Sequence, residues 1–252
     1  MNAAFCTDPP PRFSMVIPAY NEEAWLPRLL DSVSIARERY RGGGANAIEI
    51  IIADNASTDA TARIARDRGF TVAAVEKRAI AAARNGGAAL ARGEFLCFVD
   101  ADSRIHPETF NAVDTALATG RFVAGATGIH PERWSLGIAA TWLLALPLAW
   151  LAGMDAGVVF CRRSDFEAIG GYDESLLFAE DVKLLLDLKR LGRRRGERFV
   201  RARGAITITS ARKFDKHGEW HFLAAMPKSL WWAMFSHKSI DRFARNYWYE
   251  DR

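Results

Sequence analysis

The sequence predicts an α/β fold with a mostly parallel sheet. Short apolar, β-branched runs recur along the chain, and stretches rich in alanine, leucine and arginine with helical spacing lie between most of them. Strands that alternate with helices are typical of βαβ units. We expect strands at residues 13–17, 48–53, 70–75, 94–99, 122–126 and 157–161, and helices at about 23–40, 58–68, 79–91 and 107–118.

Length and composition indicate one domain with a substantial core. The chain has 252 residues, half of them hydrophobic and a quarter charged. Residues 1–12 are predicted to be a disordered leader, and without an apolar signal core they disfavour secretion. Three scattered cysteines are too few for a disulfide framework or a zinc site, which favours a reducing, cytoplasmic compartment. The net charge of +4 is compatible with an anionic substrate or membrane and proves neither.

Ligands of parallel sheets bind outside the carboxyl ends of the strands, so the residues after each strand are the candidates for chemistry. After the first strand, Pro18 fixes a turn, Tyr20 could lie against a flat base, and Glu22 could accept from ribose hydroxyls or cap the next helix. After the second strand, Asp54 sits where a carboxylate could accept the N3–H of uracil. Both segments also read as ordinary turns before helices.

The strongest local signal is Asp100-Ala101-Asp102, which follows a strand with buried texture. In an extended chain these two carboxylates point the same way, with α-carbons roughly 6.5 Å apart, and they repel unless a cation or water lies between them. A nucleoside diphosphate needs its charge neutralised as a sugar leaves. Asp is a suitable ligand for the Mg²⁺ or Mn²⁺ that does this, and the alternative is a solvated acidic turn.

Five short motifs in this order and spacing resemble the family 2 glycosyltransferases over about residues 13–195. Each is weak alone, and together they are specific. They are Val-Ile-Pro-Ala-Tyr-Asn-Glu at 16–22, Asp-Asn-Ala-Ser-Thr-Asp at 54–59, Ala-Arg-Asn-x-Gly at 83–87, Phe-Val-Asp-Ala-Asp at 98–102, and Gly-Gly-Tyr-Asp-Glu at 170–174 followed by Glu180-Asp181.

The resemblance implies a GT-A fold: a Rossmann-like, mostly parallel sheet with helices on both faces. The change in sequence texture after Ala126 predicts a nucleotide-sugar-binding half at 13–126 and an acceptor-facing half at 127–252 of this one domain. The resemblance also implies transfer of one sugar, with inversion at its anomeric carbon, to an acceptor hydroxyl or lipid phosphate. The resemblance places Pro18, Ala19, Tyr20, Glu22 and Asp54 around the nucleoside, Arg84 near the base or diphosphate, Asp100 at the ribose or sugar, and Asp102 at the metal.

The acceptor side carries the remaining candidates. The family resemblance makes Asp181 the general base that inversion requires, with Glu180 beside it and Asp155 near the acceptor or sugar. An amphipathic helix is expected at 181–191, ended by Gly192, and simple compensation of its dipole is the alternative for the Glu180-Asp181 pair. Further on, Arg212 could stabilise the departing diphosphate, and His217 could be a second metal ligand, although a lone His is more often structural or merely exposed.

Residues 134–154 carry no charge and are nominally long enough to span a bilayer. A span would put Asp102 and Asp181 on opposite sides, although both must reach one sugar. We therefore expect a helix that lies either against the membrane surface or in the protein's own core. The aromatic and basic residues of the C-terminal stretch would assist peripheral contact with the inner face of the cell membrane.

Two other functions are also compatible with part of this sequence pattern. A sugar-phosphate nucleotidyltransferase also binds nucleotide and metal, but it should carry a basic, glycine-rich loop after the first strand, where this chain has Pro18–Glu22. A non-catalytic, membrane-associated sensor of nucleotide sugars is disfavoured by the presence of both Asp102 and Asp181. A processive synthase is disfavoured because Gln-x-x-Arg-Trp is absent after residue 195. The composition of the chain gives no indication of a nucleic-acid partner.

Overall fold

The computed structural model describes residues 9–151, 157–176, 179–220 and 223, with only the backbone described over 145–151. Strands and helices alternate as expected through the first 117 residues. The strands are β1 Phe13–Ala19, β2 Ile48–Asp54, β3 Thr71–Ala74, β4 Phe95–Phe98, β5 Ser103–Arg104, β6 Phe122–Pro131, β7 Val159–Arg162 and β8 Arg198–Thr209. The helices are α1 Leu26–Glu38, the short 3₁₀ turn η1 Gly44–Ala47, α2 Thr61–Asp67, α3 Ile80–Ala89, α4 Thr109–Leu117, α5 Leu136–Leu151, α6 Arg163–Ala168, α7 Glu180–Arg195 and α8 Arg212–His217.

One eight-stranded sheet runs through the domain in the order β3-β2-β1-β4-β7-β6-β8-β5. The neighbouring strands β3, β2, β1 and β4 are parallel, as are β6 and β8, whereas β7 and β5 run antiparallel to their neighbours. The α/β class is therefore confirmed. The parallel strands β1 to β4 come from the first 98 residues of the chain, and the two antiparallel strands, β5 and β7, follow them in the sequence.

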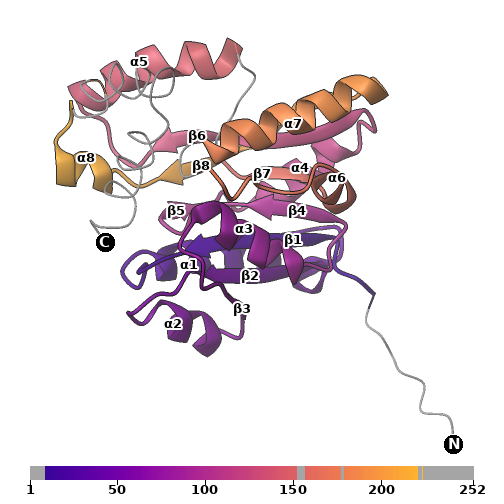
Figure 1. Ribbon diagram of the computed structural model, residues 1–252, viewed down its shortest axis with the longest axis horizontal. Helices are drawn as coiled ribbons and strands as arrows, with labels where there is room; N and C mark the ends of the chain where they lie inside the picture. The colour runs from indigo at the N-terminus through magenta and orange to yellow at the C-terminus, as the bar shows by residue number, and fades with distance from the viewer. Residues whose placement is uncertain (1–8, 152–156, 177–178, 221–222, 224–252) are drawn as a thin grey trace, which may run out of the picture.

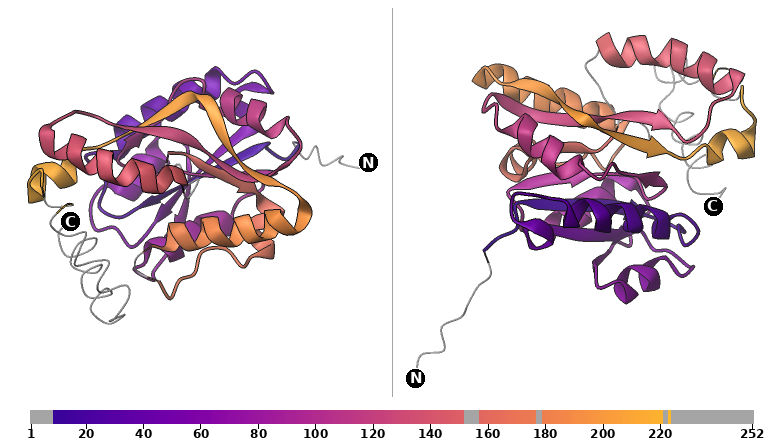
Figure 2. Two further views of the ribbon diagram at one scale, coloured as in Figure 1. Left: turned by 90° about the horizontal axis from the view of Figure 1, so that it is seen from above. Right: turned by 180° about the vertical axis from the view of Figure 1, so that it is seen from behind.

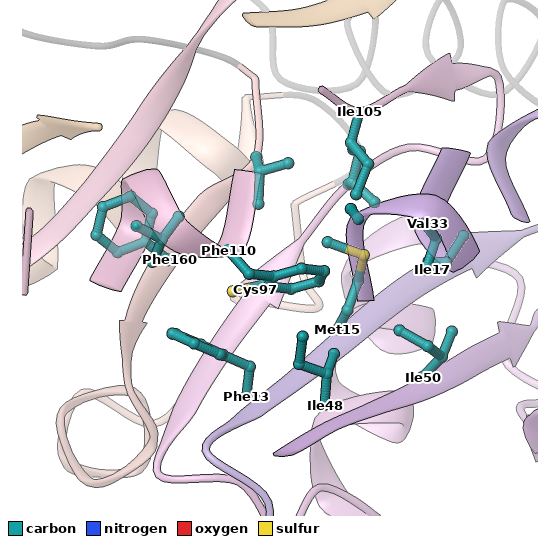
Figure 3. Close-up of a cluster of buried hydrophobic side chains, with 14 of the residues drawn as sticks. Phe13, Met15, Ile17, Val33, Ile48, Ile50, Cys97, Ile105, Phe110 and Phe160 are labelled. Carbon is teal, nitrogen blue, oxygen red and sulfur yellow. The ribbon is translucent and has the colours of Figure 1, made fainter. Parts of the chain in front are cut away.

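Helices cover both faces of the sheet, and each face has its own core (Figures 1 and 2). Every residue of β1 is buried, which is the pattern of a central parallel strand. Its odd-numbered residues Phe13, Met15 and Ile17 pack with α1, β2 and α4 (Figure 3), and Val16 packs on the other face against α3. The first turn of α1 begins with proline at its second residue, a position where no backbone donor is lost.

The parallel register brings the carboxyl ends of three strands to one edge. Ala19 of β1 is paired with Asp54 of β2, and the chain leaves β4 beside Val16, whose carbonyl accepts a bond from the amide of Val99. Helix α3 approaches this edge closely because Gly87 has no side chain: a β-carbon there would lie 2.4 Å from Val16. The motif glycine therefore has a packing role.

Three expectations need correction. Residues 11 and 12, expected in a disordered leader, belong to the folded domain, because Pro11 is buried and Arg12 bridges Glu94 and Asp114. Strand β8 was missed, because arginines on its exposed positions hide the alternation with buried Ala202 and Ala205. Helix α7 was expected to stop at Gly192 but runs to Arg195. Gly192 instead allows close packing on Val123, and Gly196, with φ of 69°, ends the helix.

Candidate active site

The loops after β1 and β2 hold each other in place. Asn21, in the left-handed region with φ of 51°, donates its backbone N–H to Ser57 Oγ, and its side-chain oxygen accepts from the amide of Thr58. The amide of Glu22 donates to Thr61 Oγ1 at 2.7 Å. These bonds fix the loop from Pro18 to Glu22 against the N-terminus of α2, so the two motifs form one rigid rim.

Asp54 ends β2 with a carboxylate oxygen that points to no protein donor. Its Oδ1 is buried and accepts no hydrogen bond. The next residue, Asn55, donates to the carbonyls of Val75 and Lys77 at 3.1 and 2.6 Å and so holds the β3–α3 loop beside Asp54. A buried acceptor without a donor is costly, which makes Oδ1 of Asp54 the natural partner of a bound N–H group.

Tyr20 lies on the same rim and is buried. The guanidinium of Arg78, from the β3–α3 loop, stands 5.2 Å from the centre of its ring. An exposed arginine over an aromatic face is a stacking surface of the kind that a planar base can join. Arg78 was not among the residues predicted from the sequence, because a single basic residue in a loop carries no distinctive pattern.

Asp100 and Asp102 were expected to lie along an extended strand, but they do not. Strand β4 ends at Phe98, and the amide of Ser103 donates a hydrogen bond to the Asp100 carbonyl. The chain therefore turns between them. Each carboxylate has its own arginine: Arg84 for Asp100 and Arg212 for Asp102. The repulsion expected between the two acids is relieved by these two guanidinium groups.

We name the first group, Arg212 with Glu22, Asp102 and Ser210, the Arg212 cluster. Arg212 begins α8 and binds Glu22 through two parallel bonds of 2.7 and 2.8 Å, while its Nε lies 2.9 Å from Asp102 Oδ2. Ser210 Oγ donates to the same Asp102 oxygen at 2.8 Å. Glu22, expected at the ribose, is buried and fully engaged in this fork.

The second group is the Arg84 cluster, made of Arg84, Asp100, Tyr172, Glu180 and Asp181. Arg84 Nη1 donates to Glu180 at 3.0 Å and to Asp181 at 2.7 Å, and Nη2 donates to Asp100 at 3.0 Å. Asp181 keeps 49% of its side chain exposed, whereas the Glu180 side chain is 10% exposed. Of these two adjacent acids, Asp181 is the one that a ligand can reach.

The surroundings of the paired acids favour their neutral forms. Desolvation raises the pKa of Asp181, the charge of Asp100 raises it further, and Arg84 opposes both. Desolvation also raises the pKa of Glu180, with the charge of Asp181 as the next cause. A carboxylate whose pKa lies above its ordinary value is a better proton acceptor than a normal aspartate, as a general base requires.

Two of the predicted site residues cannot be assigned a role from the structure. Asp155 lies outside the described residues. His217 is the exposed last residue of α8, and among the described residues no three His, Cys, Asp or Glu side chains converge as a metal site. Tyr172 was missed as a site residue although it lies inside the Gly-Gly-Tyr-Asp-Glu motif, and Ser210 was missed because it lies outside all five motifs.

The family follows from the sequence comparison. The model described as Glycosyl transferase family 2 matches residues 14–140, half of the chain, and the chain belongs to this family. The matched segment contains β1 to β4 and both aspartates of the Asp100–Asp102 turn. Helix α7 and two members of the Arg212 cluster, Ser210 and Arg212, lie C-terminal to the matched segment.

Curated relatives resemble part of the chain. A putative glycosyltransferase, EpsH, of Bacillus subtilis is 35% identical over 103 residues, which are 39% of this chain and 28% of that protein. A dolichyl-phosphate β-glucosyltransferase of Drosophila melanogaster is 31% identical over 113 residues, which are 41% of this chain and 35% of the relative. The chain thus aligns with about a third of the length of these relatives.

Solved structures share the fold. TarS of S. aureus in complex with UDP-GlcNAc superposes with a TM-score of 0.62 at 19% identity, covering 79% of this chain and 58% of that one. A mannosyltransferase of Pyrobaculum calidifontis, in complex with GDP-Man and Mn²⁺, has a TM-score of 0.59 at 19% identity and covers 87% of this chain and 65% of that one. The architecture is therefore that of the GT-A glycosyltransferases, as expected.

Proposed function

We propose that the protein transfers one sugar from a nucleotide sugar, most simply a UDP-sugar, to an acceptor hydroxyl or lipid phosphate, with inversion and with a divalent cation. The observation that carries the proposal is the meeting of three groups at one sheet edge. These are the unpartnered carboxylate oxygen of Asp54, the Asp102 carboxylate, and the exposed Asp181, which Arg84 ties to Asp100.

The donor nucleoside is assigned to the rim formed by Pro18, Ala19, Tyr20 and Asp54. Oδ1 of Asp54 would accept an N–H of the base, and uracil offers one at N3. Arg78 and Tyr20 supply a stacking surface next to it. Complexes of structural neighbours with UDP, UDP-GlcNAc and GDP-Man support a nucleotide ligand, while its place at this edge and the choice of base rest on Asp54 and Tyr20 of this chain.

The cation is assigned to Asp102. One carboxylate, with no further cluster of ligands among the described residues, fits a Mg²⁺ or Mn²⁺ ion that takes its other oxygen ligands from the diphosphate and water. When bound, the ion would neutralise charge that develops on the leaving diphosphate. Arg212, which pairs with Asp102, stands close enough to serve the same anion, and His217 remains a proposed second ligand.

Asp181 is assigned the role of general base. The acceptor oxygen attacks the anomeric carbon, the bond from that carbon to the diphosphate oxygen breaks, and the acceptor proton passes to Asp181. Attack from the face opposite the leaving group inverts the configuration. Asp100 would contact the sugar or ribose between donor and base, because it is more than half exposed and shares Arg84 with Asp181. Glu180 and Asp155 remain proposed as acceptor-side residues.

Asp54→Ala tests the donor assignment. Because the variant loses a charged acceptor that the ligand-free protein leaves unused, UDP affinity should fall roughly 10- to 100-fold, while the free protein loses little stability. Calorimetric titration with UDP and thermal unfolding measure the two effects. Asp67→Ala, at an exposed carboxylate of α2, is the matched control. Unchanged UDP affinity in Asp54→Ala would remove Asp54 from the donor site.

We further propose that α5 rests on an anionic membrane surface. The helix carries no charged residue, and Leu136 and Leu143 are 82% and 75% exposed, so one side of its described part is not covered by the protein, while Ile138 is buried against it. Trp134 and Trp142 stack edge to face near its start, an arrangement that suits a membrane interface. Within the described part of the chain no helix has the length and apolarity to cross a bilayer.

The residues around α5 supply positive charge. Arg133, just before α5, pairs with Asp215 of α8, and this short helix, whose sequence includes Lys213 and Lys216, lies next to the apolar helix (Figure 1). Arg212 begins this same α8, so a membrane-bound α5 would keep the catalytic edge near the lipid surface. The other aromatic and basic residues expected to help, Phe222, Lys228, Trp231, Trp232, Phe235, His237 and Lys238, lie outside the described residues.

Liposome flotation tests this proposal. The protein should float with vesicles that contain anionic lipid and detach as salt rises, since each basic group adds about 1 kcal/mol near the bilayer and salt screens it. Leu143→Glu should reduce flotation, whereas Leu90→Glu, at an exposed leucine just after α3, should not. No flotation of the wild type, or equal flotation of both variants, would contradict the proposal.

A further inference from the structure

Arg84 is buried beneath the carboxylates of the site, not beside an open donor cleft. Only 6% of its side chain is exposed, and its Nε is buried and lacks a hydrogen-bond partner. Both terminal nitrogens are bound to carboxylates of the protein. This placement differs from the expected contact with the base or diphosphate, because an incoming anion would have to displace acids that already hold the guanidinium.

The guanidinium joins two parts of the chain that have different roles in the proposed reaction. Asp100 follows β4 on the donor side, and Asp181 stands in the first turn of α7 on the acceptor side. Arg84 donates to both, at 3.0 and 2.7 Å. Glu180 takes a third bond and is buried, so it completes the support without facing a ligand.

The frame around Arg84 is built from two of the sequence motifs. The Tyr172 ring lies 5.0 Å from the guanidinium carbon, and the Tyr172 hydroxyl, as a hydrogen-bond donor, lowers the pKa of Asp181. Asn85, next to Arg84, accepts from the Tyr172 amide and donates to its carbonyl, both at 2.9 Å. A β-carbon on Gly171 would lie 2.7 Å from the Asn85 oxygen, so the glycine permits this contact.

We propose that Arg84 is a positioning residue, which aims the carboxylate of Asp181 at the acceptor and keeps it charged, and which touches neither donor nor acceptor. The inference rests on the proposed function only in naming Asp181 as the base. The interaction between the two side chains can be measured without a substrate.

The direction of the effect follows from the groups that face Asp181. Arg84 of α3 and Tyr172 favour the carboxylate, whereas Asp100 after β4 and Glu180 of α7 disfavour it. An opposite charge at this range lowers an aspartate pKa by about 1–3 units. Loss of Arg84 should therefore raise the pKa of Asp181. A base works only when deprotonated, so the low-pH limit of turnover would move to higher pH.

The test is a pH titration of ¹³C-labelled aspartate carboxyl groups by NMR, with the Asp181 signal assigned by its loss in Asp181→Asn. Arg84→Met should raise the pKa of Asp181 by about one unit or more, and Arg84→Lys, which keeps the charge, should restore part of it. Glu180→Gln should lower the pKa of Asp181, because Arg84 then binds one carboxylate fewer. A merely structural Arg84 would not produce shifts of opposite sign.

Tyr172→Phe supplies the same information if Arg84→Met does not fold, because it removes one donor to Asp181 and leaves all charges in place. Its shift should be smaller and upward. An Asp181 pKa that stays fixed in Arg84→Lys, Glu180→Gln and Tyr172→Phe would overturn the inference. A UDP affinity that collapses in Arg84→Lys while the pKa stays fixed would instead make Arg84 a donor ligand.

Failure of the proposed function has a different signature. In that case the Asp181 pKa would still respond to Arg84 and Glu180, but no nucleotide sugar would turn over in the wild type. If turnover occurs, the loss in Arg84→Lys should fall on kcat and on its pH dependence, with KM for the donor little changed.

Discussion

Asp181→Asn is expected to reduce sugar transfer by roughly 10²–10⁴-fold, the usual contribution of a positioned general base. The amide keeps the shape of the side chain and loses the ability to take the acceptor proton. Donor affinity should stay close to that of the wild type, because Asp181 lies on the α7 side of the site and Asp54 on the β2 side. Initial rates and UDP calorimetry on the same preparations separate the two quantities.

The neighbouring Glu180 provides the sharpest comparison. It is one residue away, binds the same arginine, and is buried, so it cannot reach an acceptor without a rearrangement of α7. Glu180→Gln should therefore cost much less than Asp181→Asn. Asp187→Asn, farther along α7 and paired with Lys183 and Arg190, controls for loss of one negative charge on the helix. A crippled Glu180→Gln beside a mild Asp181→Asn would assign the base to Glu180.

The sequence predicted the fold because its strands are unambiguous. In β1 and β4 every residue is apolar or small and buried. Pro18 lies next to the last residue of β1, and Asp100 follows β4, so the sequence marks where each strand ends. Strand β8 was not predicted because it is half-exposed and carries arginines on its exposed positions. Such a strand depends on its pairing with β6, which no local pattern reveals.

The sequence predicted many residues of the site, but it did not predict which of them contact one another. Asp54, Asp102 and Asp181 could be found because each follows a recognisable boundary of a strand or helix. Glu22 and Arg84 were expected to face the donor, yet each is buried against an oppositely charged side chain distant in the sequence, Arg212 and Asp181 respectively. Ion pairs between such distant positions follow from the tertiary fold, so the spacing of residues along the sequence does not predict them.

Asp102→Asn is expected to abolish the dependence of donor binding on Mn²⁺. In the wild type the cation joins Asp102 to the diphosphate, so its loss should weaken UDP binding in Mn²⁺ by at least about tenfold, since a charge-assisted interaction contributes roughly 1.5–3 kcal/mol. In EDTA the variant and the wild type should bind UDP almost equally. The comparison in EDTA is needed because Asp102 also holds Ser210 and Arg212.

Asp215→Asn is the matched control for this change. Asp215 lies in the same α8 that Arg212 begins, and it pairs with Arg133 away from Asp102. If Asp215→Asn weakens UDP binding as much as Asp102→Asn does, the loss comes from displaced α8 and not from a missing ligand. Equal UDP affinity of Asp102→Asn and wild type under every condition would remove the metal role from Asp102.

Calorimetric titration of the wild-type protein with UDP, in Mn²⁺ and in EDTA, tests the central claim most directly. A nucleotide-sugar site at the edge formed by Asp54 and Asp102 predicts UDP binding that strengthens at least about tenfold when Mn²⁺ is present, the counterpart of the Asp102→Asn loss. Absence of UDP binding both with and without Mn²⁺ would contradict it.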